Sequence, residues 1–413
     1  MKYANMKYAN MKYVVVLMDG AADEPILALD NATPLEYADT AAIDKLAPYS
    51  KIGMVQTIPE GCAKGSDTAN LSVLGYNPLK YYFGRSPLEA LSMGVSLKDT
   101  DVTFRTNVVT LSEEEDYENK IILDHSADEI TTEEAKELIL AVETALGDDI
   151  KKFYPGVSYR HLLVWDHGST DVKLIPPHDI LDQCIGEHKP TGVASDMIWE
   201  MMKKSYEILN HHPINEARRQ KGLKPANSIW IWGEGTKPLL PLFKDKYQVE
   251  GAVISAVDLI KGIGIGAGMT SIDVEGVTGN VHTNYKGKAD AAIKWLIEED
   301  KDFVYVHLEG PDECGHRNEL DNKIKAIEYI DKKVISPITQ ALDSKSIEYK
   351  MLVVPDHPTP LRLRTHTGDP VPFMIYQSGS EINNKDNRYT EKFAKNTGYL
   401  IEEGHTLMDV FLK

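Results

Sequence analysis

The serine at position 66 stands in a setting that favours nucleophilic chemistry. It follows Gly65 and comes just before a predicted helix, where free backbone amides and the positive helix end favour both an alkoxide and a phosphate. An ordinary N-cap serine is the alternative. Because no histidine base is evident beside Ser66 in the sequence, its hydroxyl needs another way to lose its proton. A divalent cation is one such way, since a coordinated oxygen is far more acidic than a free one.

Three distant segments carry residue types that bind divalent cations. Any one of these groups alone would more often be a surface or capping feature. Together they offer oxygen and nitrogen donors for two ions such as Mn, Zn, Co or Mg, and three aspartates with a serine alkoxide would balance two dications. One serine beside two metals points to phosphoryl transfer. The candidate ligands are Asp19, Asp312, His316, Asp356, His357 and His366.

The predicted strands explain how these segments can meet. Nearly unbroken apolar runs at 12–18, 303–308 and 351–354 each end one to four residues before an aspartate of this set. Such runs are typical of strands buried on both faces, as in a parallel sheet covered by helices. Ligands of such sheets gather outside the carboxyl ends of the strands. We therefore expect an α/β fold with a mostly parallel sheet.

The chain is long enough for two domains. Its 413 residues exceed one ordinary core, and the candidate ligands lie only near its two ends. We predict one discontinuous domain, 11–91 with 256–413, interrupted by a smaller inserted α/β or α+β domain at 92–255. Helical patterns fall near 35–47, 132–146, 193–210, 287–299 and 319–342, and a further strand is predicted at 371–376.

Composition narrows the partners and the compartment. A net charge of −18 disfavours a nucleic-acid partner, and a small anion would need a local cluster of Arg, Lys or metal to overcome that field. No apolar run approaches the roughly 18 residues of a membrane span. Three cysteines without paired spacing favour a reducing cytoplasm. Met-Lys-Tyr-Ala-Asn stands twice before Met11, and we interpret residues 1–10 as a duplicated start without signal-peptide features.

Three arginines and a histidine are candidates for anion binding. Arg85, Arg105 and Arg160 stand in compact contexts beside glycines or predicted strands, and a guanidinium can grip carboxylate or phosphate with two hydrogen bonds. For each arginine alone, a surface salt bridge is an equal alternative. His125 could orient a substrate hydroxyl or cap the helix that follows. The alternating glycines at 262–268 lack the acidic partner of a dinucleotide loop, which favours backbone packing or a hinge.

Taken together, these motifs resemble the 2,3-bisphosphoglycerate-independent phosphoglycerate mutases of the archaeal type, within the alkaline phosphatase superfamily. The resemblance runs from Tyr13 to about Tyr376, nearly the whole chain, and implies an alkaline-phosphatase-like sheet with an inserted domain. The segments that carry it are 65–76, 156–164, 176–179, 255–264 and 311–316.

The resemblance also implies roles for the candidate residues. One metal, Mn being expected first, would be held by Asp19, Ser66, Asp356 and His357. A second would be held by Asp312, His316 and His366. Lys261 would contact the phosphoryl group or the substrate. The substrate residues would be Arg85, Arg105, His125 and Arg160.

By this resemblance the chain would interconvert 3-phosphoglycerate and 2-phosphoglycerate. Ser66 would take the phosphoryl group and return it to the other hydroxyl, behind a lid formed by the inserted domain. A small-molecule phosphotransferase such as a homoserine kinase, which Asn-Ser-Ile-Trp at 227–230 resembles, is one alternative. A phosphatase and a binding protein on an inactive fold are others. A small phosphorylated substrate is the expected partner, and a homo-oligomer stays open.

Overall fold

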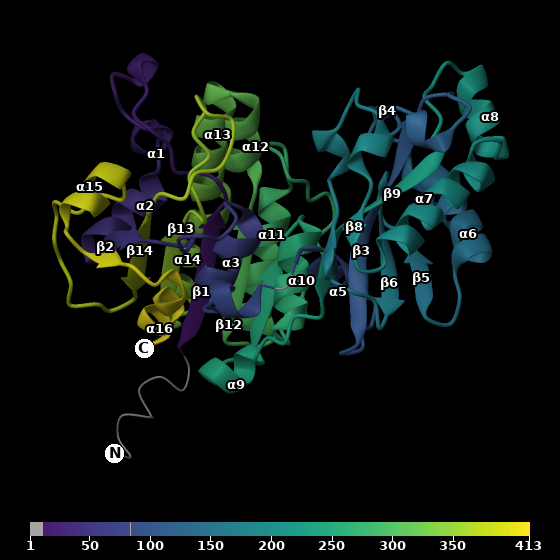
Figure 1. Ribbon diagram of the computed structural model, residues 1–413. Helices are drawn as coiled ribbons and strands as arrows, with labels where there is room; N and C mark the ends of the chain where they lie inside the picture. Colours follow the sequence, from purple (N-terminus) through teal and green to yellow (C-terminus); the bar gives the residue numbers. More distant parts are fainter. Residues whose placement is uncertain (1–10, 83) are drawn as a thin grey trace. The chain divides into compact units, whose positions relative to one another are not determined.

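Figure 1 shows the computed structural model of the chain, which describes residues 11–82 and 84–413. The proposed duplicated start at 1–10 lies outside the described residues. Contacts between the described residues divide the chain into two compact units. The first unit comprises residues 11–82 and 239–413, and the second comprises residues 84–238. The chain therefore leaves the first unit once and returns to it.

The edges of the second unit differ from the boundaries at 92 and 255 that the sequence suggested. Helix α5 (Ser86–Ser92) packs against strands β3 (Asp101–Leu111) and β9 (Ser228–Thr236) of the second unit. Strand β10 (Gly251–Ile254) instead pairs in parallel with β12 (Phe303–Leu308) of the first unit. Both edges depend on packing between distant segments, which local composition does not encode.

A mostly parallel sheet forms the centre of the first unit, as the sequence predicted. Its other strands are β1 (Lys12–Met18), β2 (Ser50–Val55), β11 (Thr270–Ser271), β13 (Tyr349–Val354), β14 (Val371–Gln377) and β15 (Leu400–Ile401). The order is β11-β10-β12-β1-β13-β14-β2-β15, and β14 alone runs antiparallel to its neighbours in this described sheet. Every residue of β1, β12 and β13 is buried, which explains their apolar sequences.

Three neighbouring strands bring the candidate metal ligands to one edge of this sheet. β12, β1 and β13 are parallel, with Met18 beside Leu308 and Leu17 beside Val354. Their carboxyl ends therefore lie at the same edge, where ligands of such sheets bind. Each strand is followed within four residues by an aspartate: Asp312, Asp19 and Asp356 respectively.

Helices cover this sheet close to where the sequence placed them. The region predicted at 319–342 consists of α13 (Leu320–Ile330), a π-helical turn and α14 (Ser336–Ser344). The prediction for 35–47 is wrong in one respect, because α1 (Pro34–Tyr37) ends and α2 (Ala41–Leu46) starts after a break. The remaining helices used below are α3 (Ser66–Val73), α10 (Asp258–Gly266), α11 (Tyr285–Ile293) and α12 (Gly310–Arg317).

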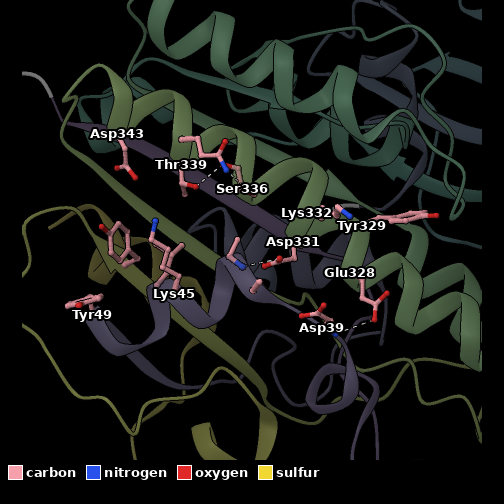
Figure 2. A pocket seen from close by; sticks show the side chains of 15 residues that line it. Asp39, Lys45, Tyr49, Glu328, Tyr329, Asp331, Lys332, Ser336, Thr339 and Asp343 are labelled. Atoms are coloured by element: carbon pink, nitrogen blue, oxygen red, sulfur yellow. Dashed lines mark hydrogen bonds between the residues drawn. The ribbon is translucent and has the colours of Figure 1, made fainter.

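The start of α2 is held by Asp331, from the π-helical turn between α13 and α14. Its carboxylate accepts hydrogen bonds from the N–H groups of Ala42 (3.0 Å) and Ile43 (2.8 Å), whereas the side chain of Thr40 at the N-cap makes no capping bond. Figure 2 shows Asp331 in the lining of a cavity of about 590 Å³ between these helices. The lining mixes acidic and basic side chains and includes none of the candidate metal ligands.

An antiparallel sheet with two long helices forms the second unit. Besides β3 and β9, it contains β4 (Ile122–Asp124), β5 (Lys151–Tyr154) and β6 (Arg160–Asp166), in the order β4-β3-β6-β5 with β9 also paired to β3. Helix α6 (Thr132–Leu146) has the predicted bounds, and α7 (Ser195–Leu209) differs by two residues or fewer. Both pack on one face of this sheet, and α5 packs on the other. Among the described residues, no helix is long and apolar enough to cross a bilayer.

Candidate active site

Asp312, His316 and His366 form the first group of candidate metal ligands. His316 and His366 each place Nε2 3.3 Å from an oxygen of Asp312, and the two Nε2 atoms lie 2.8 Å apart. The Nδ1 atoms lie 2.9 Å from the carbonyl oxygen of Arg364 and 3.0 Å from that of Lys64. A carbonyl oxygen only accepts, so both Nδ1 atoms carry protons and both rings turn Nε2 toward Asp312. Two imidazole nitrogens converging on a carboxylate are a donor set that fits a divalent cation.

Asp19, Asp312 and His357 form a second group. One ligand atom of each lies within 4.8 Å of the others. Asp19 Oδ1 is buried and has no hydrogen-bond partner among the described residues. A buried carboxylate oxygen without a partner is costly, and a cation bound there would remove that cost. Asp312 takes part in both groups, which was not predicted from the sequence.

Ser66 and Asp356 lie beside His357. Ser66 Oγ is 3.0 Å from His357 Nε2, and Asp356 Oδ2 is 3.3 Å from the same nitrogen. Ser66 is the first residue of α3, whose N-cap is Gly65, so the interpretation of Ser66 as the N-cap is wrong. The histidine that was missing from the local sequence of Ser66 thus comes from a segment 291 residues away.

Burial and neighbouring charges set the protonation of this site. Burial, followed by the carboxylates of Asp356 and Asp312, raises the pKa of Asp19 well above its usual value. Burial also acts to raise the pKa of Asp312, but hydrogen bonds from His316 and His366 outweigh it and hold that pKa well below its usual value. Burial lowers the pKa of His357. The crowded carboxylates of Asp19, Asp312 and Asp356 repel one another, and divalent cations would relieve that repulsion.

Several buried polar residues that were not predicted from the sequence hold these groups in place. The amide nitrogen of Asn70 donates to Asp356 Oδ2 (2.9 Å), and its oxygen accepts from the Tyr305 hydroxyl (2.6 Å). His307 Nε2 lies 2.8 Å from Asp19 Oδ2. Tyr305 and His307 stand inside an apolar strand, and a polar side chain at such a position was the available signal.

Thr359 holds Asp312 through a hydrogen bond, and Lys323 in turn holds Thr359. The Thr359 hydroxyl donates to Asp312 Oδ1 at 2.5 Å, and its carbonyl oxygen accepts from Lys323 Nζ at 2.8 Å. Lys323 is fully buried and pairs with Asp23 at 2.6 Å. The loop that carries Thr359 is therefore anchored by a buried ion pair, which nothing in the local sequence indicated.

Lys261 lies on α10 of the first unit. Its ammonium group pairs with the exposed Asp273 at 2.8 Å. Among the described residues it makes no hydrogen bond or ion pair with the candidate metal ligands. Its predicted contact with a phosphoryl group therefore stays a prediction.

The second unit brings Arg85 and Arg105 together on one carboxylate. Both Nε atoms lie 3.1 Å from Glu89, Arg85 on Oε1 and Arg105 on Oε2. The Arg105 side chain is 12% exposed, and its guanidinium lies 4.2 Å from the centre of a Trp232 ring. The fork of Arg105 is therefore held by a carboxylate and an aromatic face, a pre-organised arrangement for recognising an anion.

His125 and Arg160 join this region through aromatic contacts. His125 lies edge-on to Tyr159 at 5.6 Å and to His178 at 6.0 Å, and Arg160 stands 5.4 Å from the Tyr159 ring. His178 in turn contacts Trp232 at 5.3 Å. We call Arg85, Arg105, His125, Arg160 and His178 the arginine–histidine cluster. Trp232 and His178 were not predicted as site residues, although His178 stands in the segment 176–179 that carries the family resemblance.

Comparisons with known proteins agree along nearly the whole chain. A sequence model of a family described as 2,3-bisphosphoglycerate-independent phosphoglycerate mutase matches residues 47–215. A protein of Geobacter sulfurreducens, named a probable 2,3-bisphosphoglycerate-independent phosphoglycerate mutase, is 47% identical over 97% of this chain and 99% of its own length. The enzyme of that name from Methanosarcina barkeri is 45% identical over 97% and 98%. The solved PH0037 protein from Pyrococcus horikoshii matches with a TM-score of 0.81 and 30% identity, covering 98% of this chain and 97% of that chain.

Proposed function

The chain belongs to the family of 2,3-bisphosphoglycerate-independent phosphoglycerate mutases, and we propose that it interconverts 3-phosphoglycerate and 2-phosphoglycerate through a phosphoserine at Ser66. The observation that carries the proposal is the position of Ser66 Oγ, at the start of α3 and 3.0 Å from His357 Nε2. A hydroxyl at a helix start faces free amides that favour an anionic oxygen and a phosphate. The relatives named as mutases support this function over the kinase and phosphatase alternatives.

The transfer has two steps, in which Ser66 Oγ first accepts the phosphoryl group and then gives it back. Ser66 Oγ forms a bond to phosphorus while the bond from phosphorus to the 3-oxygen of the substrate breaks, and the serine proton ends on that 3-oxygen. The 2-oxygen of the glycerate then forms a bond to the same phosphorus while the bond from phosphorus to Ser66 Oγ breaks, and the proton of the 2-hydroxyl ends on Ser66 Oγ. Nothing is consumed, so no 2,3-bisphosphoglycerate is required. Water must be excluded between the steps, because it would turn the transfer into hydrolysis.

The two groups of metal-type residues fit a pair of divalent cations. One cation would lie on the first group, and we propose Mn²⁺ because the donors mix oxygen and nitrogen. When bound, the cations would lower the pKa of the Ser66 hydroxyl and balance the charge of the phosphoryl oxygens. The proposed ligands are Asp312, His316 and His366 for one ion and Asp19, Ser66, Asp356 and His357 for the other.

The arginine–histidine cluster would bind the carboxylate and hydroxyl groups of the glycerate. A protein with a net charge of −18 needs such a local concentration of cations to attract an anionic substrate. Arg85, Arg105 and Arg160 would pair with its oxygens, and His125 would orient a hydroxyl. Lys261 would contact the phosphoryl group, for which it would exchange its exposed partner Asp273.

The proposed setting is cytoplasmic. The three cysteines, Cys62, Cys184 and Cys314, are all free, which suits a reducing compartment. The excess of acidic residues does not suit nucleic acid as a partner. A small phosphorylated metabolite is therefore the partner we propose, and the oligomeric state is left open.

A coupled enolase assay with purified protein, 3-phosphoglycerate and Mn²⁺ tests the proposal. We expect turnover without added 2,3-bisphosphoglycerate, loss of turnover with EDTA and recovery with Mn²⁺. Formation of phosphohomoserine from homoserine and ATP, with no mutase turnover, would support the kinase alternative instead. Release of inorganic phosphate as the main product would support a phosphatase.

A further inference from the structure

His307 is an ionisable side chain inside a wholly buried strand. It lies on β12 with no exposed surface, a position that normally holds an apolar residue. Its Nε2 lies 2.8 Å from Asp19 Oδ2, and its Nδ1 lies 3.1 Å from Ser255 Oγ. Ser255 follows β10 and Asp19 follows β1, the two strands that flank β12. A chain of hydrogen bonds therefore crosses three strands at the edge that carries the metal-type residues.

The direction of this chain follows from its far end. Ser255 Oγ accepts the N–H of Val257 at 2.9 Å, and among the described residues His307 Nδ1 is the acceptor in reach of the serine proton. Nδ1 therefore accepts, and in a neutral imidazole the other nitrogen must carry the proton. His307 Nε2–H then donates to Asp19 Oδ2. The serine thus selects the tautomer of the histidine.

The chain of hydrogen bonds gives the two oxygens of Asp19 different roles. Oδ2 is occupied by His307. Oδ1 is buried without a partner among the described residues and lies 3.7 Å from His357 Nε2, within the second group of candidate ligands. A carboxylate held by one oxygen has its other oxygen aimed in a fixed direction, which favours binding a cation there.

We propose that His307, held in one tautomer by Ser255, is a positioning residue that fixes Asp19 so that Oδ1 alone faces a divalent cation. The inference rests on the metal sites of the proposed function and adds two residues that touch neither the substrate nor the cation. Replacement of His307 should therefore weaken one metal site and spare the other, which depends on Asp312, His316 and His366.

Titration of the EDTA-stripped, full-length protein with Mn²⁺ by calorimetry tests the inference. We expect two binding events in the wild type, and for His307→Leu a loss of about 10–100-fold in the affinity of one of them. His307→Gln retains an N–H near the position of Nε2, so it should restore much of that affinity. His161→Leu, which replaces a buried strand histidine of the second unit, is the matched control and should leave both affinities unchanged.

The outcomes separate this inference from the proposed function. A wild-type protein that binds no Mn²⁺ would overturn both. Wild-type affinities at both sites in folded His307→Leu would overturn the role of His307 alone, as would a His307→Gln variant no better than His307→Leu. If circular dichroism shows that His307→Leu does not fold, Ser255→Ala decides. That variant frees the tautomer and must weaken the same single site, and two unchanged sites would contradict the role.

Discussion

Atoms that lack a partner or crowd against one another locate the chemistry of this molecule. Asp19 Oδ1 is buried and unpaired among the described residues, and the Nε2 atoms of His316 and His366 meet at 2.8 Å beside a carboxylate. A folded protein seldom leaves a buried oxygen such as Asp19 Oδ1 without a partner. Each of them is satisfied at once by a cation, and Ser66 Oγ lies within reach of the same group of residues.

Arg105 provides a prediction about substrate binding. Its guanidinium is held between Glu89 and Trp232, so Arg105→Lys keeps the charge but loses the two-pronged fork. We expect kcat/KM for 3-phosphoglycerate to fall about 10–100-fold, mainly through KM, the effect of losing a hydrogen bond to a charged group. Steady-state kinetics of this variant would be compared with Arg219→Lys, a surface arginine of the same unit paired with Glu113. Equal kinetics in the two variants would contradict the binding role.

Glu391 provides a prediction about pH and stability. Burial raises its pKa to about 7, whereas the pKa of a glutamate in the unfolded chain is about 4.3. Between these values the native protein binds more protons than the unfolded chain, so the free energy of unfolding falls as the pH rises. The side chain at this position does not titrate in Glu391→Gln. As the pH rises from about 5 to about 8, the free energy of unfolding of the variant should therefore increase by about 1–3 kcal/mol relative to that of the wild type. Chemical denaturation at both pH values measures this, and a constant difference would contradict the shifted pKa.

At the scale of helices and strands, the pattern of the sequence predicted elements better than it predicted their interruptions. The bounds of α6 were correct because its cap, its acidic first turn and its apolar spacing are all local. The break between α1 and α2 was missed because Asp331, which holds the start of α2, lies 289 residues away from Ala42. The same distinction applies to the site. Strand ends pointed to Asp19, Asp312 and Asp356, whereas His307, Asn70 and Thr359 acquire their roles through hydrogen bonds to segments distant in the sequence.

The contact between Asp331 and α2 can be tested directly (Figure 2). Asp331→Ala removes the acceptor of two N–H groups at the helix start and should cost about 1–2 kcal/mol of stability, as the loss of a helix cap does. The kcat of the folded enzyme should not change. Thermal unfolding of this variant would be set beside that of Lys332→Ala, an exposed neighbour on the same turn. A stability loss no larger than that of the control would show that α2 does not need this cap.

At the scale of the whole molecule, acidic and basic site residues are distributed unevenly between the two units. The chain carries −18 overall, and the first unit concentrates buried aspartates where the cations are proposed. The second unit gathers the arginine–histidine cluster, which we propose binds an anionic substrate. On this proposal each unit binds an ion or a ligand of opposite charge, which would tie the stability of the first unit to its metals.

Removal of the metals should therefore lower the stability of the protein. Mn²⁺ present at about 100 times its dissociation constant should contribute about 2.7 kcal/mol, which corresponds to a rise of several degrees in Tm. Differential scanning calorimetry of EDTA-stripped protein, with and without Mn²⁺, measures this effect. Asp312→Asn, which weakens a ligand shared by both groups, should show a smaller rise. A Tm that does not respond to Mn²⁺ in the wild type would contradict the proposed sites.

The nucleophilic role of Ser66 is tested most directly by the turnover of Ser66→Ala in the coupled enolase assay. Ser72→Ala is the matched control, because Ser72 is a buried serine of the same helix whose hydroxyl has no hydrogen-bond partner among the described residues. We predict that kcat falls by at least about 10⁴-fold in Ser66→Ala, as expected when a nucleophile is removed, and stays near the wild-type value in Ser72→Ala. Substantial mutase turnover by a folded, metal-loaded Ser66→Ala would contradict transfer through a phosphoserine at this position.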